Sequence, residues 1–168
     1  MASGRNNKLV GQTGEYLVAA ELSRRGLIAT TFTGNVPHYD IIVSDEIGRH
    51  ASVQVKAGRL GSWQFGNISL FCEIVFENKR QIITTVKAAP VQRLIFVFAK
   101  IGDEPSQDRF YVLTWSELQE LVISKYADLL LRNNGTRPRK WDSLHVAVKE
   151  KVLFPYRDNW QVIHDNLA

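Results

Sequence analysis

The chain has 168 residues, a formal net charge of +4 and an apolar fraction of 45%, with four Trp, eight Phe and five Tyr. These values exclude a disordered or fibrous chain and are typical of one globular domain, which we expect to span residues 1–168. The sole cysteine, Cys72, excludes an internal disulfide and favours a reducing cytoplasm. We expect no membrane partner, because the sequence has neither a signal-peptide pattern nor a run of about 18 apolar residues.

The first predicted element is a helix. Residues 8–25 are good helix formers without proline, and Gly26 follows as a helix terminator. Steps of three and four from Gly11 give small or apolar residues with one carboxylate, Glu15, which predicts that Glu15 lies on the face turned to the core. Gly11 and Gly14 each cost about 1 kcal/mol of helix propensity, so we expect another backbone to approach closely here.

Three short strands follow this helix. Residues 27–33 are rich in β-branched side chains and predict a strand, and so do residues 39–43 and 51–57. The polar segment 44–50 contains a glycine and suits the turn of a hairpin. We therefore expect the second and third strands to pair antiparallel.

The alternation of this hairpin gathers polar side chains on one face. Gln54 and Lys56 point the same way from their strand, because side chains alternate with a period of two. Asp40 shares its own face with Ile42, so a matching register would bring Asp40, Gln54 and Lys56 together.

The second half of the chain predicts further strands and a helix. Residues 93–101 contain a nearly continuous apolar run, which suits a central strand buried on both faces, and residues 110–113 look like its neighbour. Thr114 or Ser116 suits the cap of a long amphipathic helix. Residues 68–86 give no clear signal.

The order of these polar residues resembles a known family. A helical Glu15, then Asp40 at the start of a strand, then Gln54-Val55-Lys56 on the next strand is similar to the core of the PD-(D/E)xK nuclease superfamily. The resemblance covers residues 8–57 and is closest in style to small Holliday-junction-resolvase-like and restriction-endonuclease-like proteins. It implies an α/β fold with a restriction-endonuclease-like core, a central mixed β-sheet flanked by helices.

The resemblance also implies a chemistry. In such nucleases Mg²⁺ or Mn²⁺ supports hydrolysis of DNA phosphodiester bonds, and its preferred ligands are oxygens. Asp40 would be the principal metal ligand, Gln54 and Glu15 would be further ligands, and Lys56 would orient the attacking water or steady negative charge. Cutting a duplex or junction needs two sites, so we expect a homodimer.

Two departures from the family pattern leave alternatives open. Gln54 stands where the family has a second acid, and Pro37 is separated from Asp40 by two residues. A neutral ligand lowers metal affinity. The replacement of the acid by Gln54 would therefore also be found in a catalytically impaired nuclease-fold module that binds nucleic acid or a protein. A further alternative is that Gln54 and Lys56 merely form the wet face of a half-buried strand.

Basic and aromatic residues outside the motif have two interpretations each. Arg137, Arg139 and Lys140 lie in a loop without acids and Arg59 follows the motif, so all four are candidates for nucleic-acid binding, although a charge run is as often solvated surface. The remaining aromatics are assigned as follows: Trp63 and Phe65 either stack on bases or, as we prefer, join the core, and Trp141 and Trp160 serve packing.

Overall fold

The structure, a computed structural model, describes residues 4–32, 34 and 36–168 and divides the chain into two units. Unit 1 comprises Met1–Trp63, Pro90–Trp115 and Lys149–Ala168, and unit 2 comprises Gln64–Ala89 and Ser116–Val148. The expectation of one domain over residues 1–168 stays a prediction. In the described part of the chain, no helix is both long enough and apolar enough to cross a membrane.

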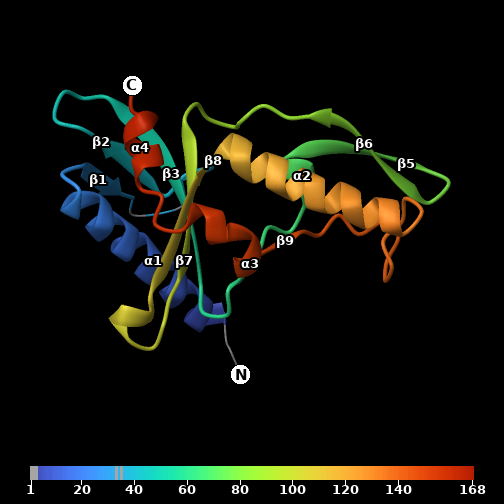
Figure 1. Cartoon of the computed structure of the whole chain (residues 1–168), viewed down its shortest axis with the longest axis horizontal. Helices are drawn as coiled ribbons and strands as arrows, with labels where there is room; N and C mark the ends of the chain where they lie inside the picture. The colour runs from blue at the N-terminus through green and yellow to red at the C-terminus, as the bar shows by residue number, and fades with distance from the viewer. Residues whose placement is uncertain (1–3, 33, 35) are drawn as a thin grey trace. The chain divides into compact units, whose positions relative to one another are not determined.

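Unit 1 is built on a five-stranded sheet (Figure 1). Its order is β1-β2-β3-β7-β8, where the strands are β1 (Ile28–Thr31), β2 (Ile41–Ser44), β3 (His50–Gly58), β7 (Leu94–Lys100) and β8 (Arg109–Thr114). The β3–β7 pair is parallel and the other pairs are antiparallel, so the sheet is mixed. Buried residues make up β7 except at its last position, as the apolar run predicted for a central strand.

The β2–β3 hairpin has the predicted pairing, and its turn is held by one acid. Asp45 accepts the backbone N–H groups of Ile47 and Arg49, and its carboxylate pairs with the Arg49 side chain at 2.7 Å. Gly48 has φ of 86°, a conformation that glycine adopts without steric cost. The turn places Ile41 opposite Val53.

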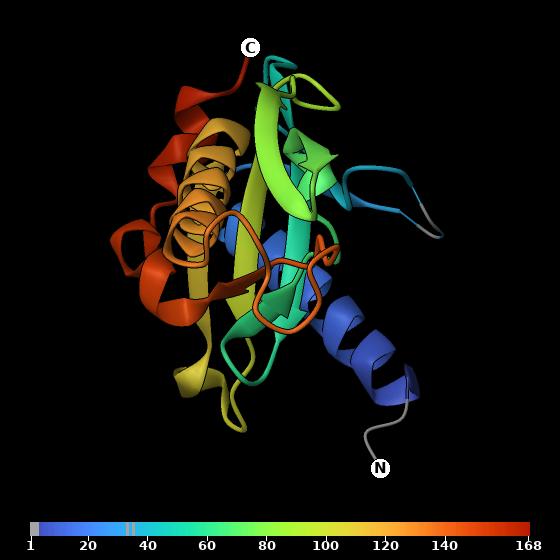
Figure 2. The ribbon, with the colours of Figure 1, turned by 90° about the vertical axis from the view of Figure 1, so that its right-hand side faces the viewer.

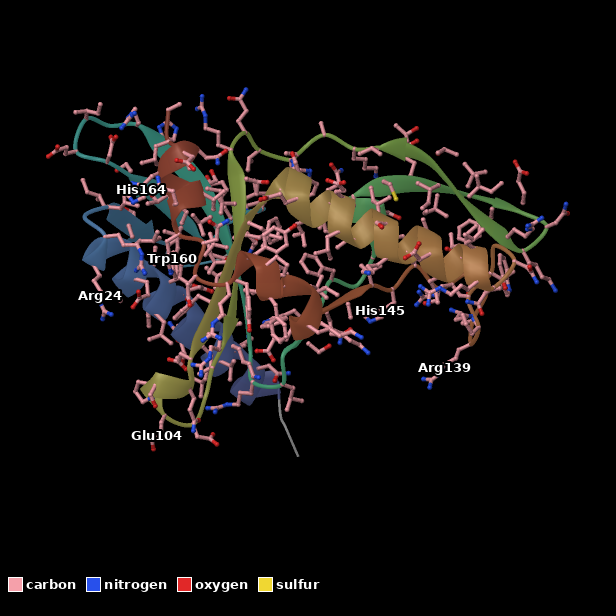
Figure 3. All side chains as sticks on the ribbon, in the orientation of Figure 1. Arg24, Glu104, Arg139, His145, Trp160 and His164 are labelled. Atoms are coloured by element: carbon pink, nitrogen blue, oxygen red, sulfur yellow. The ribbon has the colours of Figure 1, made fainter. Side chains whose placement is uncertain are left out.

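Helix α1 (Gly4–Arg24) covers one face of this sheet and passes behind β3 in the turned view of Figure 2. Gly26 ends the helix with φ of 79°, as predicted. Val18 and Leu22 of α1 pack in a core with alternate residues of the strands, and the short helix α4 (Gln161–Asp165) adds Ile163 to the same core. Trp160, labelled in Figure 3, packs in the same core, and the guanidinium of Arg25 lies over its ring.

Unit 2 combines a strand pair with a long helix. Strands β5 (Cys72–Glu77) and β6 (Arg80–Val86) form an antiparallel hairpin in the region that gave no signal, and helix α2 (Trp115–Arg132) matches the predicted helix. Gln119 of α2 donates to the carbonyls of Phe71 and Lys87, which ties the helix to both strands at the open end of the hairpin. Cys72 is fully buried, as expected for a small core residue.

The remaining elements are short. They are β4 (Ser62–Gln64), β9 (Ala147–Lys149), α3 (Glu150–Leu153), and the 3₁₀ turns η1 (Ile68–Leu70), η2 (Pro105–Gln107) and η3 (Phe154–Tyr156). Strands β4 and β9 pair with each other.

The aromatic side chains fall mostly in the core. Trp63 is only 3% exposed and contacts the rings of Phe98 and Tyr111, so the preferred core assignment is confirmed for it. Phe65 is partly buried against Phe71. Trp141 packs edge-on against the ring of Phe76 while 42% of it stays exposed, so its assignment to packing is confirmed only in part.

Candidate active site

Asp40 lies at the entrance to β2 and is fixed by contacts with β3. Its backbone N–H donates to the carbonyl of Val53 at 2.8 Å, which extends the hairpin pairing by one residue beyond β2. Its carboxylate oxygen Oδ2 accepts the backbone N–H of Val55 at 2.7 Å and the side-chain amide of Gln54. The structure therefore brings Asp40 and Gln54 together, on the face that strand alternation predicted.

Lys56 completes the strand-borne part of the site. It follows Gln54 by two residues on β3, and its positive charge acts on the Asp40 carboxyl. Both side chains are partly buried and alternate with buried Val53 and Val55. Gln54 and Lys56 therefore share one face of β3, opposite the face of the buried valines.

Glu15 reaches the site because α1 approaches β3 very closely. A Cβ added to Gly14 would overlap the Cβ of Ala57 and lie 3.6 Å from Cγ1 of Val55, so only glycine fits at this contact. This confirms the expected close approach at Gly14. The expectation was wrong for Gly11, where an added Cβ would meet no atom within 4 Å.

Burial disfavours the charged forms of both carboxyl groups, and the charge of Asp40 adds to this effect at Glu15. Burial raises the pKa of Asp40, and the Val55 N–H, the charge of Lys56 and the Gln54 amide only partly offset this effect. Burial also raises the pKa of Glu15, and the negative charge of Asp40 raises it further. A site with two partly desolvated acids in each other's field gains from a cation placed between them.

The donor set fits a hard divalent cation. Glu15 and Asp40 supply carboxylate oxygens, and the Gln54 amide has an oxygen to offer, which are the ligand types that Mg²⁺ takes together with water. Across residues 4–32, 34 and 36–168, no cluster of three or more His, Cys, Asp or Glu could hold a metal, so any metal here relies on Gln54 or water as its third ligand. In the structure the amide nitrogen of Gln54 faces Asp40.

The candidate phosphate-binding residues are divided between the units. Arg59 of unit 1 donates to the carbonyl of Gly102 and pairs with Asp103 at 3.2 Å. In unit 2, Arg137 donates to the carbonyl of His145 and lies over the ring of Tyr126, whereas Arg139 projects from its loop (Figure 3). Lys140 lies 3.5 Å from the carboxylate of Asp142, so this loop is not free of acid contacts as its sequence suggested.

Two features of unit 1 escaped sequence reasoning. The Val55 donor is a backbone group, which no residue type signals. Glu150 joins Lys100 at 2.7 Å and Tyr111 at 2.6 Å, but it lies 50 residues from Lys100 in the chain, so no local pattern links them. Burial of the Tyr111 hydroxyl and its hydrogen bond to the Glu150 carboxylate raise the pKa of Tyr111.

Comparison with known proteins places the fold. No family model and no curated protein matches the chain. Among solved structures, it is similar to a bacterial homing endonuclease, I-Ssp6803I, with a TM-score of 0.50 and 16% sequence identity, over 94% of this chain and 93% of that chain. At this identity the likeness bears on fold alone. The chain therefore has the predicted α/β architecture, a central mixed sheet flanked by helices, in a nuclease-like fold.

Proposed function

We propose that the chain is a metal-dependent endonuclease that hydrolyses DNA phosphodiester bonds at a PD-(D/E)xK-like site. The observation that carries the proposal is the fixed position of Asp40, held by the Val55 N–H and the Gln54 amide within the fields of Lys56 and Glu15. The endonuclease activity named for the similar solved structure supports the same reaction class.

Each residue has a role in this proposal. Asp40 and Glu15 would hold Mg²⁺ or Mn²⁺, with Gln54 contributing its amide oxygen. The ion, when bound, would polarise the phosphate oxygen and acidify a water molecule. Lys56 would orient that water or steady the charge that develops on the phosphate. The Val55 N–H keeps the Asp40 carboxylate in one orientation, so little reorganisation is needed when substrate binds.

A second candidate function is supported by Gln54 itself. Its amide donates to Asp40 and so satisfies that carboxylate without a cation. A chain in which this contact persists would bind nucleic acid without cutting it. For Gln54 to act as a metal ligand, its amide group must turn so that its oxygen instead of its nitrogen faces the metal.

A cleavage assay separates the two candidates. Supercoiled, linear, branched and single-stranded DNA would be incubated with Mg²⁺ or Mn²⁺ and the wild type, Asp40→Ala or Lys56→Ala. We expect each variant to lose about a hundredfold or more in rate. Asp128→Ala and Lys125→Ala on α2 are matched controls and should cut like the wild type. Equal activity in all five proteins would contradict the proposed site, and binding without cutting by the wild type would favour the second candidate.

We also propose a homodimer, because each chain offers one such site and a duplex has two strands to cut. Light scattering at assay concentrations measures the mass in solution. A protein that is monomeric throughout and still cuts both strands in one binding event would contradict the dimer.

A further inference from the structure

A row of cations lies beyond Lys56 at the end of the sheet. Gly58, two residues after Lys56 on β3, pairs with Lys100 of β7, and Lys100 pairs with Arg109 of β8. Side chains two residues apart share a face, and paired residues on neighbouring strands also share one, so Lys56, Lys100 and Arg109 all belong to the same face. The row lies roughly 7 Å further along β3 than Lys56, at two strand residues of about 3.3 Å each.

This end of the sheet carries an open cavity of about 560 Å³. The residues that line it include three cations, Arg59, Lys100 and Arg109, and two acids, Asp103 and Glu150. Arg109 donates to the carbonyl oxygens of Ser106 and Asp108, which are neutral acceptors, so these bonds leave its positive charge in place. The cavity therefore has a positive balance close to the candidate active site.

The acids differ in what they do to these cations. Asp103 has a side chain that is 94% exposed, so its contact with Arg59 is a solvated surface ion pair of the kind that contributes little. Glu150 is held more firmly, by the hydroxyl of Tyr111 and by its own N–H, which donates to the carbonyl of Gly61 at 2.8 Å. It fixes the Lys100 ammonium at the cavity, so ordering this lysine costs little side-chain entropy when an anion binds.

We infer that this cavity binds a backbone phosphate of the DNA strand, a neighbour of the phosphate that is cut beside Asp40. The inference rests on the proposed function and adds Lys100 and Arg109 to the binding residues. Lys100 pairs with Gly58, two residues beyond Lys56 on β3, so these cations lie within reach of a phosphate next to one held at Lys56. Arginine suits this role because its planar group forms paired bonds to phosphate oxygens. Such a contact fixes the position of the strand and reads no sequence.

The test measures DNA binding by the full chain carrying Asp40→Asn, so that the probe, a short fluorescent duplex, is not cut. Adding Arg59→Gln should weaken binding roughly three- to tenfold at physiological salt and reduce the slope of log affinity against log salt by about 0.9. Arg109→Gln should act in the same direction. Asp103→Asn should change binding much less than Arg59→Gln does, because the Asp103 side chain is 94% exposed and its charge is screened by solvent.

Arg49→Gln is the matched control. Like Arg59, Arg49 is about half exposed, at 54% against 50%, and is paired with one aspartate, but it lies in the turn at the opposite end of β3. It should leave affinity and salt slope unchanged. If Arg59→Gln changes neither quantity, or if Arg59→Gln and Arg49→Gln reduce both equally, the phosphate cavity is wrong while the endonuclease proposal stands on its cleavage data. If the wild type neither binds nor cuts DNA, both are wrong.

Discussion

The Asp40 carboxylate accepts the backbone N–H of Val55 at 2.7 Å, and this bond joins the residue before β2 to the strand that carries Gln54 and Lys56. Only replacement by proline removes a backbone N–H, so the position of Asp40 depends on the register of the hairpin. The site is therefore as rigid as the β2–β3 pairing.

Replacing Gly14 by alanine should destabilise the protein, because the added Cβ would overlap Ala57. We expect a loss of about 1–3 kcal/mol in the free energy of unfolding, measured by urea denaturation. Gly11→Ala is the control in the same helix. With no atom within 4 Å of its added Cβ, it should stabilise the protein by about 0.5–1 kcal/mol. Effects of the same sign at both positions would argue against a close contact between α1 and β3.

The stability of the metal-free protein should depend on pH through Glu15. Burial and the charge of Asp40 raise the pKa of Glu15 in the folded state, so the folded chain holds this proton more tightly than the unfolded chain, where acids titrate near about 4. The ionisation of Glu15 therefore lowers the free energy of unfolding as the pH rises from the pKa of Glu15 in the unfolded chain through its pKa in the folded chain.

The comparison that reveals this cost is wild type against Glu15→Gln. The wild type should lose stability relative to the variant as pH rises through that window, and Mg²⁺ at neutral pH should restore it. The measurement is chemical denaturation at a series of pH values in buffer with a chelator. A wild type that gains stability relative to Glu15→Gln over this window would rule out the predicted charge repulsion.

Gln54→Glu should strengthen metal binding and weaken the metal-free fold. The added carboxylate raises the ligand charge, for which we expect roughly tenfold tighter Mg²⁺ binding. It also removes the amide that donates to Asp40 and adds a third acid to the site. Thermal unfolding with and without Mg²⁺ measures both effects. Relative to the wild type, Gln54→Glu should have a lower Tm in chelator and a larger rise in Tm when Mg²⁺ is added. Gln92→Glu, on an exposed position before β7, should change neither, and an unchanged metal response in Gln54→Glu would exclude Gln54 as a ligand position.

The loop of unit 2 should contribute to DNA affinity if its cations contact phosphates. Arg139→Ala with Lys140→Ala leaves Arg137, which bonds the His145 carbonyl, in place. We expect weaker binding and a salt slope reduced by about 0.9 for each phosphate contact that is lost. Fluorescence anisotropy at several salt concentrations measures both, and Lys125→Ala on α2 serves as a control for the loss of charge. Unchanged affinity would identify the loop as solvated surface.

The β2–β3 hairpin was predictable because its polar and apolar residues alternate and its turn contains Gly48. The β5–β6 hairpin was not. Val75 and Ile82 face each other on the exposed side of the pair, so apolar residues occupy both faces and the alternation disappears. Its turn places Asn78 and Lys79 at positive φ, and lysine is not a residue that signals such a turn.

Within the site, the sequence predicted which residues would meet but not how they would bond. Strand alternation placed Asp40 beside Gln54, and the helical stripe placed Glu15 toward the sheet. The direction of the Gln54 amide depends on the proton donors and acceptors around it, which only the assembled structure supplies. The Lys100–Glu150 pair could not be predicted, because its two residues lie 50 positions apart in the sequence and local periodicity relates only near neighbours.

The central claim is that the charge of Asp40 supports metal-dependent cleavage of DNA, and the most direct measurement is single-turnover cleavage by Asp40→Asn in Mg²⁺. Asparagine keeps an oxygen that can accept the Val55 N–H, so the fold and the hairpin register should survive while the metal-binding charge is lost. We predict a rate at least about a hundredfold below that of the wild type, with Asp128→Asn cutting normally. An Asp40→Asn protein that cuts as fast as the wild type would contradict the proposed site.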